Sequence, residues 1–259
     1  MGDSHETPAV DGGSEHMAAI QTMSLTKDFK SRRAVDELSL TVDEGEVFAL
    51  LGANGAGKTT VIRMLCCLLA PTSGDALVLG DSILADPEAV KRKINISPQE
   101  TAVALKLSVA ENLEFMARIY GGSKAEARLS AGDMMAALHL SDRAKDRSKS
   151  LSGGMQRRLS LAMALISRPR VVFLDEPTLG LDVGARRDLW RSLAEIEGAA
   201  TVVLTTHYLE EAQAHADRIG VMRDGRLVGL GTAAELQLST GADTLEDAFL
   251  SLTGTGEER

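Results

Sequence analysis

Cysteine and aromatic residues are scarce in this sequence. The 259 residues include two cysteines, adjacent at Cys66 and Cys67, and only 3% are Phe, Trp or Tyr. Adjacent thiols fit neither a disulfide framework nor the spaced ligands of a zinc site, which indicates a reducing compartment such as the cytosol. With so few aromatic rings, the hydrophobic core must be built mainly from aliphatic side chains.

Long apolar runs and an excess of positive charge are also missing. The longest apolar stretches, residues 47–51 and 64–70, fall far short of the roughly 20 residues that cross a bilayer, so any membrane role has to come through a partner. Lys and Arg number 28 against 37 Asp and Glu, a formal charge of −9, and no long basic run occurs. This balance argues against a nucleic-acid partner and against binding to an anionic membrane surface.

Both ends of the chain are polar. The first sixteen residues hold four acids, no Lys or Arg and no apolar core, which is unlike a signal peptide. We expect residues 1–17 to be a disordered leader, residues 18–254 to form the folded domain, and residues 255–259 to be a short tail.

Strand-like apolar runs alternate with helical patterns through the folded part. Buried strands are predicted over residues 47–51, 94–97, 171–175, 201–206 and 219–222, after two short strands over 19–25 and 38–42. Helices are predicted over residues 183–198 and 208–216, and a helical insert over 108–144. Alternating β and α units with nearly unbroken apolar strands indicate an α/β fold with a mostly parallel sheet covered by helices.

The strongest chemical signal is GANGAGKT, residues 52–59, between the strand at 47–51 and a helical run over 60–70. It has the G-x-x-x-x-G-K-[ST] spacing of a phosphate-binding loop, in the strand–loop–helix context that this loop requires. Glycines let consecutive N–H groups face one anion, and the helix N-terminus adds its positive dipole end. Lys58 is expected to neutralise the β- and γ-phosphates, and Thr59 to ligate Mg²⁺. The loop residues expected to contact the nucleotide are Asn54, Gly55, Ala56, Gly57, Lys58, Thr59 and Thr60.

An acidic pair follows the predicted strand at residues 171–175, in the segment VVFLDEPT. Asp175 is expected at the carboxyl edge of the sheet, where the phosphate loop also opens. Because side chains alternate along a strand, Asp175 and Glu176 point different ways, so that Asp175 can hold Mg²⁺ while Glu176 faces the attacking water. The alternative is that these acids only form a turn at the end of the strand, before Pro177. The presence of a phosphate loop in the same chain argues against that alternative.

Three further segments complete a set of motifs. LSGGM at residues 151–155 precedes a helical run, so a serine and two glycines stand at a helix N-terminus and form a second anion site. Gln99 follows the predicted strand at 94–97, and His207 follows the one at 201–206. Together with the phosphate loop, the acidic pair and a GLD segment, they occur in the order typical of the ATP-binding cassette (ABC) ATPases. The chain resembles this family over nearly all of residues 18–254.

The resemblance implies a phosphate-loop NTPase fold of the ABC type, with an antiparallel β subdomain and a helical subdomain over about residues 100–165. It implies that two cassettes, identical or different, enclose two ATP molecules, and that Ser152, Gly153 and Gly154 of one contact the γ-phosphate bound by the other. Asp182 then bridges the two subunits. Phe29 resembles the aromatic residue that stacks on adenine, although a lone Phe near a strand is often part of the core.

Roles for individual residues also follow from the resemblance. It implies that Glu176 polarises the attacking water and that His207 holds the γ-phosphate and the water. Lys58 is the third expected catalytic residue. Gln99 would sense Mg²⁺ and the transmembrane partner, so that the implied metal ligands are Thr59, Gln99 and Asp175. The chain departs from the commonest family pattern at Met155 and Val183, while the serine and glycines that contact the anion remain.

Three segments resemble the drug- and polysaccharide-exporter branch, which includes daunorubicin-resistance-like ATPases: residues 107–121, 180–190 and 244–254. In that branch the cassette pairs with a separate integral-membrane permease, which implies a peripheral protein at the cytoplasmic face of the membrane. A soluble ABC ATPase for iron–sulfur assembly, DNA repair or other non-transport work is the alternative. The missing coiled-coil insertion argues against repair. Outside the family, a phosphate-loop kinase would need an acceptor site, and none is recognisable.

Overall fold

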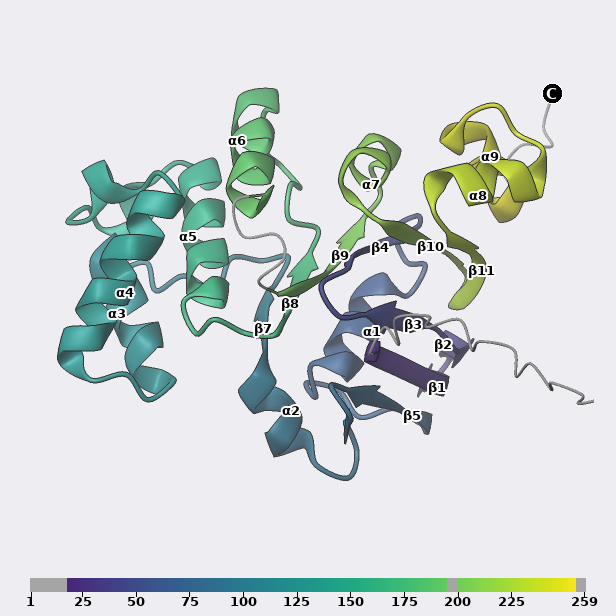
Figure 1. Ribbon diagram of the computed structural model, residues 1–259, viewed down its shortest axis with the longest axis horizontal. Coiled ribbons are helices and arrows are strands. Elements are labelled where there is room, and N and C mark those ends of the chain that lie inside the picture. The colour runs from purple at the N-terminus through teal and green to yellow at the C-terminus, as the bar shows by residue number, and fades with distance from the viewer. Residues whose placement is uncertain (1–17, 195–199, 255–259) are drawn as a thin grey trace, which may run out of the picture.

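The computed structural model describes residues 18–194 and 200–254, and the leader and tail expected over 1–17 and 255–259 lie outside them. Figure 1 shows a central sheet, a second sheet beside it, and an arm of helices at one side. The domain limits, 18–254 with a helical subdomain over about 100–165, stay predictions.

The central sheet has six strands in the order β11-β10-β4-β9-β8-β7. Five strands run parallel, and the edge strand β11 is antiparallel to β10. Every residue of β4, β8 and β9 is buried, as expected for strands covered on both faces. The predicted mostly parallel sheet is therefore confirmed. Its strands are β4 (Val47–Leu51), β7 (Ile94–Ser97), β8 (Val171–Asp175), β9 (Thr201–Thr206), β10 (Arg218–Arg223) and β11 (Arg226–Gly231).

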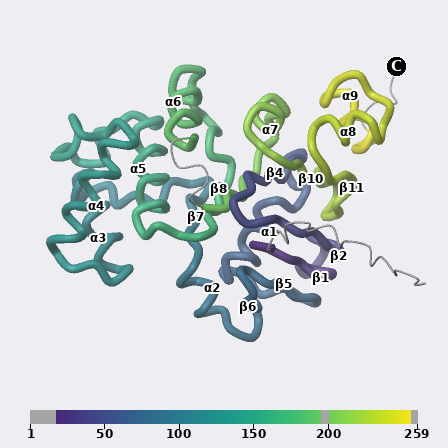
Figure 2. Tube along the Cα trace, viewed as in Figure 1, coloured from purple at the N-terminus to yellow at the C-terminus, as the bar shows by residue number. Residues whose placement is uncertain are grey.

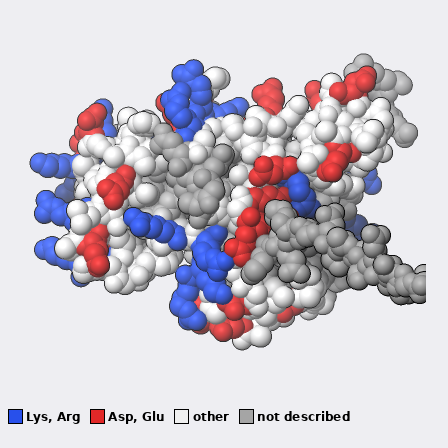
Figure 3. All heavy atoms as spheres, viewed as in Figure 1, with Lys and Arg blue, Asp and Glu red and all other residues white. Residues whose placement is uncertain are grey.

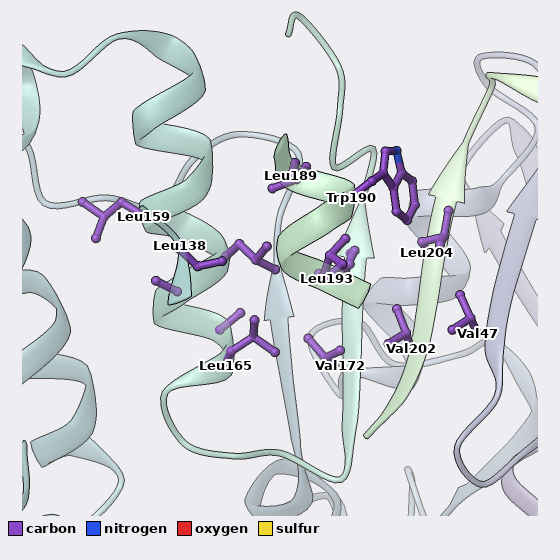
Figure 4. Close-up of a cluster of buried hydrophobic side chains, with 14 of the residues drawn as sticks. Val47, Leu138, Leu159, Leu165, Val172, Leu189, Trp190, Leu193, Val202 and Leu204 are labelled. Carbon is purple, nitrogen blue, oxygen red and sulfur yellow. The ribbon is translucent and has the colours of Figure 1, made fainter. Parts of the chain in front are cut away.

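Alternate residues of these strands face two separate cores, because side chains alternate along a strand. Val172 and Leu204 belong to a core that also contains Leu193 of the covering helices (Figure 4). Phe48 and Phe173 point to the opposite core, which the sheet shares with helix α1 and the second sheet. The helices on the first face are α5 (Gly153–Leu165), α6 (Val183–Ala194) and α7 (Leu209–His215), with α8 (Ala233–Thr240) and α9 (Leu245–Thr253) against β10 and β11.

The predicted limits of two helices, 183–198 and 208–216, agree with the structure to within one residue at the ends that it describes. Helix α6 begins at Val183 as predicted, and residues 195–198 of the predicted helix lie outside the described part of the chain. Helix α7 runs from Leu209 to His215, one residue inside the predicted limits at each end.

The second sheet is antiparallel, with the order β2-β1-β5-β6 and β3 paired to β1. It is the antiparallel part of the fold that the resemblance implied. The strand predicted over 38–42 is wrong in its limits. One strand ends at Leu38 and the next begins at Thr41, and between them the Leu40 N–H donates to the Thr22 side chain, Oγ1, at 2.9 Å. The strands are β1 (Ala18–Phe29), β2 (Arg32–Leu38), β3 (Thr41–Asp43), β5 (Ser73–Val78) and β6 (Asp81–Ser82).

Helix α1 (Lys58–Leu65) is shorter than the run predicted over residues 60–70. Cys67 has a φ of 55°, in the left-handed region where helices commonly end. The N–H groups of Leu68 and Leu69 both donate to the Arg63 carbonyl, at 2.9 and 3.1 Å. The prediction was wrong because the apolar residues continue through this turn, and apolarity by itself does not show where the backbone leaves the helix.

The helical arm contains α3 (Val109–Ile119) and α4 (Lys124–Ala137), which pack on each other and on α5. Each begins at a serine whose hydroxyl accepts from the backbone N–H of a glutamate three residues later, while the glutamate carboxylate accepts from the serine N–H. These capping boxes fix the helix starts. Figures 1 and 2 show the arm at the opposite side of the molecule from α8 and α9. Helix α2 (Pro87–Lys93) and two short 3₁₀ turns, Ser141–Arg143 and Ser148–Ser150, complete the described elements.

Charged side chains of both signs are spread over the surface. On the face drawn in Figure 3, Lys and Arg gather on α6 and along the outer edge of the helical arm, with Asp and Glu among and between them. Within residues 18–194 and 200–254, no helix is long and apolar enough to cross a membrane.

Candidate nucleotide-binding and hydrolysis site

The phosphate loop lies between the end of β4 and the first turn of α1. Gly57, the N-cap of α1, has a φ of 107°, and a Cβ there would collide with the Ala34 carbonyl oxygen, so glycine is required. Lys58 is 5% exposed, and its Nζ donates to the carbonyls of Gly52 at 2.6 Å and Ala53 at 3.3 Å. The ammonium therefore lies over the loop, next to the positive end of the α1 dipole.

Hard oxygen donors meet beside the start of α1. The hydroxyls of Thr59 and Thr205 donate to Oδ1 of Asp175, at 3.0 and 2.7 Å. Among the described residues, no group of three or more His, Cys, Asp or Glu side chains gathers. One carboxylate and a threonine hydroxyl nevertheless fit Mg²⁺, which keeps several waters and takes its remaining ligands from substrate phosphates.

Glu176 lies between a lysine and a histidine that come from other elements. Its Oε1 is 3.2 Å from Lys58 Nζ, and its Oε2 is 2.8 Å from His207 Nδ1. The residue is 6% exposed and has a φ of 47°, which is uncommon for a non-glycine residue. Its N–H donates to Thr205 Oγ1 at 2.9 Å, which holds this turn in place. The Asp175 and Glu176 carboxylates thus have separate sets of partners.

One cleft of about 500 Å³ is lined by Lys58, Thr59, Glu176 and His207. Phe29 from the end of β1 forms one wall, and the residue is 49% exposed, so it is not part of the core. Arg32, Ala34 and Leu179, which the sequence analysis did not single out, also line the cleft. The predicted residues along it are Phe29, Asn54, Gly55, Ala56, Gly57, Lys58, Thr59, Thr60, Gln99, Glu176 and His207.

Five predicted residues do not line this cleft. Asp175 is buried, and the hydroxyl of Thr59, which does line the cleft, donates to it. Ser152 caps α5, where its hydroxyl accepts from the Met155 N–H at 3.3 Å, and Gly153 and Gly154 form the first turn of that helix. Asp182 lies at the start of α6, and its carboxylate accepts from the Ala185 N–H at 2.9 Å. Ser152 and Gly153 are exposed and Gly154 is half-buried, and none of the three lines the cleft of its own chain.

Comparison with known proteins decides the family. Residues 35–179 match the family described as ABC transporter. The chain belongs to the ABC transporter family. It is 44% identical over 229 residues to the daunorubicin/doxorubicin resistance ATP-binding protein DrrA of Streptomyces peucetius, covering 88% of this chain and 69% of that protein. It is 36% identical over 239 residues to the linearmycin resistance ATP-binding protein LnrL of Bacillus subtilis (strain 168), covering 92% and 76%.

Solved structures agree with this assignment. An ATP-binding subunit of an ABC transporter superimposes with a TM-score of 0.82 at 26% identity, covering 90% of this chain and 99% of that one. The ATP-binding cassette MJ0796, a dimer in a post-hydrolysis state bound to ADP and Pi, gives a TM-score of 0.76 at 25% identity, covering 82% and 98%. This ABC ATPase therefore binds and hydrolyses ATP, and the predicted exporter-type resemblance is confirmed. The iron–sulfur assembly alternative is not favoured, because these relatives are resistance ATP-binding proteins.

Arg157 of α5 is a residue of this ABC ATPase that the sequence analysis missed. It is 4% exposed, and its guanidinium donates to the carbonyls of Asp175 and Pro177, both at 2.8 Å. It also donates to the carbonyls of Pro98 and, at 3.2 Å, Gln99. Burial lowers the pKa of Arg157 to about 10, so it stays protonated at neutral pH. Arg157 links the segment holding Gln99 to the residues on both sides of Glu176, and the local sequence around an arginine in a helix gives no signal of such a link.

Proposed function

We propose that this ABC ATPase hydrolyses MgATP in the cleft lined by the phosphate loop, Glu176 and His207. Two cassettes act together and drive export through a separate integral-membrane permease, at the cytoplasmic face of the membrane. The observation that carries the proposal is the position of Glu176, whose two carboxylate oxygens contact Lys58 and His207 beside the phosphate loop.

The shape of the cleft favours one orientation of the nucleotide. The exposed ring of Phe29 offers a stacking surface for adenine at one end, with Lys27 Nζ 5.5 Å from the ring centroid. At the other end, Lys58 and the N-terminus of α1 attract the β- and γ-phosphates. Lys58 now donates to two loop carbonyls and contacts Glu176, so that binding of the triphosphate exchanges these partners for phosphate oxygens.

Thr59, Asp175 and Gln99 are the residues that would hold Mg²⁺. When bound, this ion neutralises the charge that develops on the phosphate oxygens. The Thr59 hydroxyl and the Asp175 carboxylate already lie 3.0 Å apart, and Gln99 lines the same cleft from the loop after β7.

Glu176 orients the attacking water. The water oxygen bonds to the γ-phosphorus while the bond to the β–γ bridging oxygen breaks, which gives ADP and phosphate, and Glu176 accepts a hydrogen bond and then a proton from the water. His207 contacts the far oxygen of Glu176 at 2.8 Å, so it fixes the carboxylate and reaches the γ-phosphate from the end of β9. When the phosphates bind Lys58, the Glu176 carboxylate loses its contact with the lysine and is free to accept a hydrogen bond from the water.

The second cassette supplies what a single cleft lacks. Ser152 and the glycines after it stand at the N-terminus of the 13-residue helix α5, which is a place where anions bind, yet they do not line the cleft of their own chain. In a head-to-tail pair, they complete the γ-phosphate site of the other chain. Asp182, exposed at the start of α6, then lies between the two chains.

An exposed apolar surface on the helical arm supports docking of a permease. Phe115 is 57% exposed, Ile119 60% and Tyr120 42%, all near the end of α3. Exposed apolar patches commonly mark interaction sites. A small cavity of about 110 Å³ adjoins α3, and Met116 and Pro98 both line it. Because Pro98 precedes Gln99, a partner at this surface acts directly on the segment that Arg157 connects to the catalytic turns.

Co-purification from detergent-solubilised membranes tests the proposed function. The wild-type chain is expected to bring down an integral-membrane protein and to release phosphate from ATP. Phe115→Glu with Ile119→Glu should lose the membrane protein and keep ATP hydrolysis by the isolated chain. Leu238→Glu is the matched control, because Leu238 is 84% exposed on α8, at the opposite side of the molecule. Recovery of a soluble assembly scaffold in place of a membrane protein would contradict the proposal.

A further inference from the structure

Arg32 begins β2, directly across the β1–β2 hairpin from Phe29, its partner in the strand register. The next residue, Arg33, points to another side, where its guanidinium contacts Asp28 and Asp36, both at 2.8 Å. Arg32 instead lines the nucleotide cleft. Two neighbouring arginines therefore have different surroundings, as alternation along a strand requires.

The guanidinium of Arg32 contacts the phosphate loop at Gly55. It donates to the Gly55 carbonyl, and its two terminal nitrogens lie 3.7 and 3.8 Å from the position that a Cβ on Gly55 would occupy. Within residues 18–194 and 200–254, Arg32 has no ion pair with a carboxylate. A guanidinium has five N–H donors, so several remain for an anion after the bond to Gly55.

We infer that Arg32 binds the α-phosphate of the nucleotide. The inference rests on the proposed orientation, with adenine at Phe29 and the β- and γ-phosphates at Lys58. Arg32 lies between these two ends, because it is paired with Phe29 in the hairpin and contacts Gly55 in the loop. A nucleotide that spans the cleft places its ribose and α-phosphate there. The planar fork of a guanidinium matches two phosphate oxygens, which makes arginine well suited to this contact.

A contact with the α-phosphate predicts that replacing Arg32 weakens nucleotide binding and leaves the rate of hydrolysis of bound ATP unchanged. The α-phosphate neither gains nor loses a bond during γ-phosphate transfer, so the contact is equally strong in the ground state and the transition state. Removing such an interaction raises KM and leaves kcat unchanged. A lost charge-assisted hydrogen bond at an exposed site such as Arg32 corresponds to about a tenfold loss of affinity.

Competition with a fluorescent ADP analogue tests the inference, using ATP, ADP, AMP and adenosine on the purified full chain. Arg32→Gln should weaken ATP, ADP and AMP by the same factor, about tenfold, and leave adenosine unchanged. Arg32→Lys should recover part of the loss. Arg33→Gln is the matched control, because it removes the neighbouring charge outside the cleft, and it should change none of the four affinities.

Three results would overturn the inference. Equal affinities for Arg32→Gln and wild type would show that Arg32 makes no contact. A loss for ATP and ADP but not AMP would show that Arg32 acts through the loop and the β-phosphate. A loss that includes adenosine, or a fall in kcat, would show that the substitution disturbs the hairpin or the reaction. Wild-type chain that binds no nucleotide would instead contradict the proposed function, which keeps the two failures separate.

Discussion

His207 Nδ1 and Glu176 Oε2 are 2.8 Å apart, although 31 residues separate them in the chain. The contact joins the carboxyl ends of β8 and β9, which are neighbours in the sheet. The other oxygen of Glu176 contacts Lys58, from the phosphate loop. Three elements thus determine where one carboxylate lies.

Glu176→Gln should keep ATP binding and lose most hydrolysis. The amide still forms hydrogen bonds, but it cannot accept the proton of the attacking water or orient the water as a carboxylate does. A loss of about 10² to 10⁴-fold in kcat is expected, measured as phosphate release. Glu210→Gln, which changes an exposed glutamate on α7, should hydrolyse ATP at the wild-type rate. Wild-type turnover by Glu176→Gln would rule out the assigned role.

Lys58→Ala should weaken nucleotide binding itself. The ammonium contacts ground-state phosphates as well as the transition state, so its loss lowers affinity as well as rate. Equilibrium titration with a fluorescent ATP analogue measures the change. Lys91→Ala removes an exposed lysine of α2 and serves as the control. If Lys58→Ala bound the analogue as tightly as wild type, the loop would not be the binding site.

Arg157→Lys should lower both stability and kcat while leaving KM close to the wild-type value. A lysine keeps the charge but cannot donate to four carbonyls on the two segments 98–99 and 175–177, so buried carbonyls lose their partners. The free energy of unfolding is expected to fall by about 1–3 kcal/mol, measured by denaturant titration. The rate falls because the turns around Glu176 are no longer held by the guanidinium.

Arg158→Lys is the control for this substitution. Arg158 is on the same helix, and its Nη1 is 3.5 Å from the Leu138 carbonyl of the helical arm, away from the acidic pair. Its replacement should leave kcat unchanged. Equal kcat values for Arg157→Lys and wild type would show that Arg157 does not position the catalytic turns.

Mixing two inactive variants tests whether Ser152 acts on the other chain. Ser152→Arg blocks the N-terminus of α5 with a bulky positive charge, and Lys58→Ala removes the phosphate ligand. In a heterodimer, one composite site carries both defects, and the other pairs an intact Lys58 with an intact Ser152. ATPase activity should return on mixing, with a maximum near equal amounts.

Two control measurements show that the mixed variants are folded and form heterodimers. Differently tagged chains show that heterodimers form, and thermal melting shows that Ser152→Arg is folded despite the loss of a helix cap, which costs about 1 kcal/mol. If folded heterodimers form but ATPase activity stays absent at every mixing ratio, the result would contradict a model in which Ser152 acts on the other chain and one intact composite site hydrolyses ATP without the second.

Features that depend on neighbouring residues could be predicted from the sequence. The spacing of glycines and Lys58 predicted the phosphate loop, and unbroken apolar runs predicted strands β4, β8 and β9. Both signals are local, because loop geometry and side-chain alternation depend on residues close together in the chain. The order of the motifs was enough to identify the family.

Features that depend on contacts between distant segments become visible only in the folded chain. Thr59 and Asp175 are 116 residues apart, and their 3.0 Å contact exists because the sheet brings two strand ends together. Arg32 and Arg157 carry no local pattern that distinguishes them from surface arginines, so their placement against carbonyls of other segments could not be predicted. Likewise, only the backbone turn at Cys67 ended α1 before the apolar run was complete, since a hydrophobic pattern records burial and not the direction of the chain.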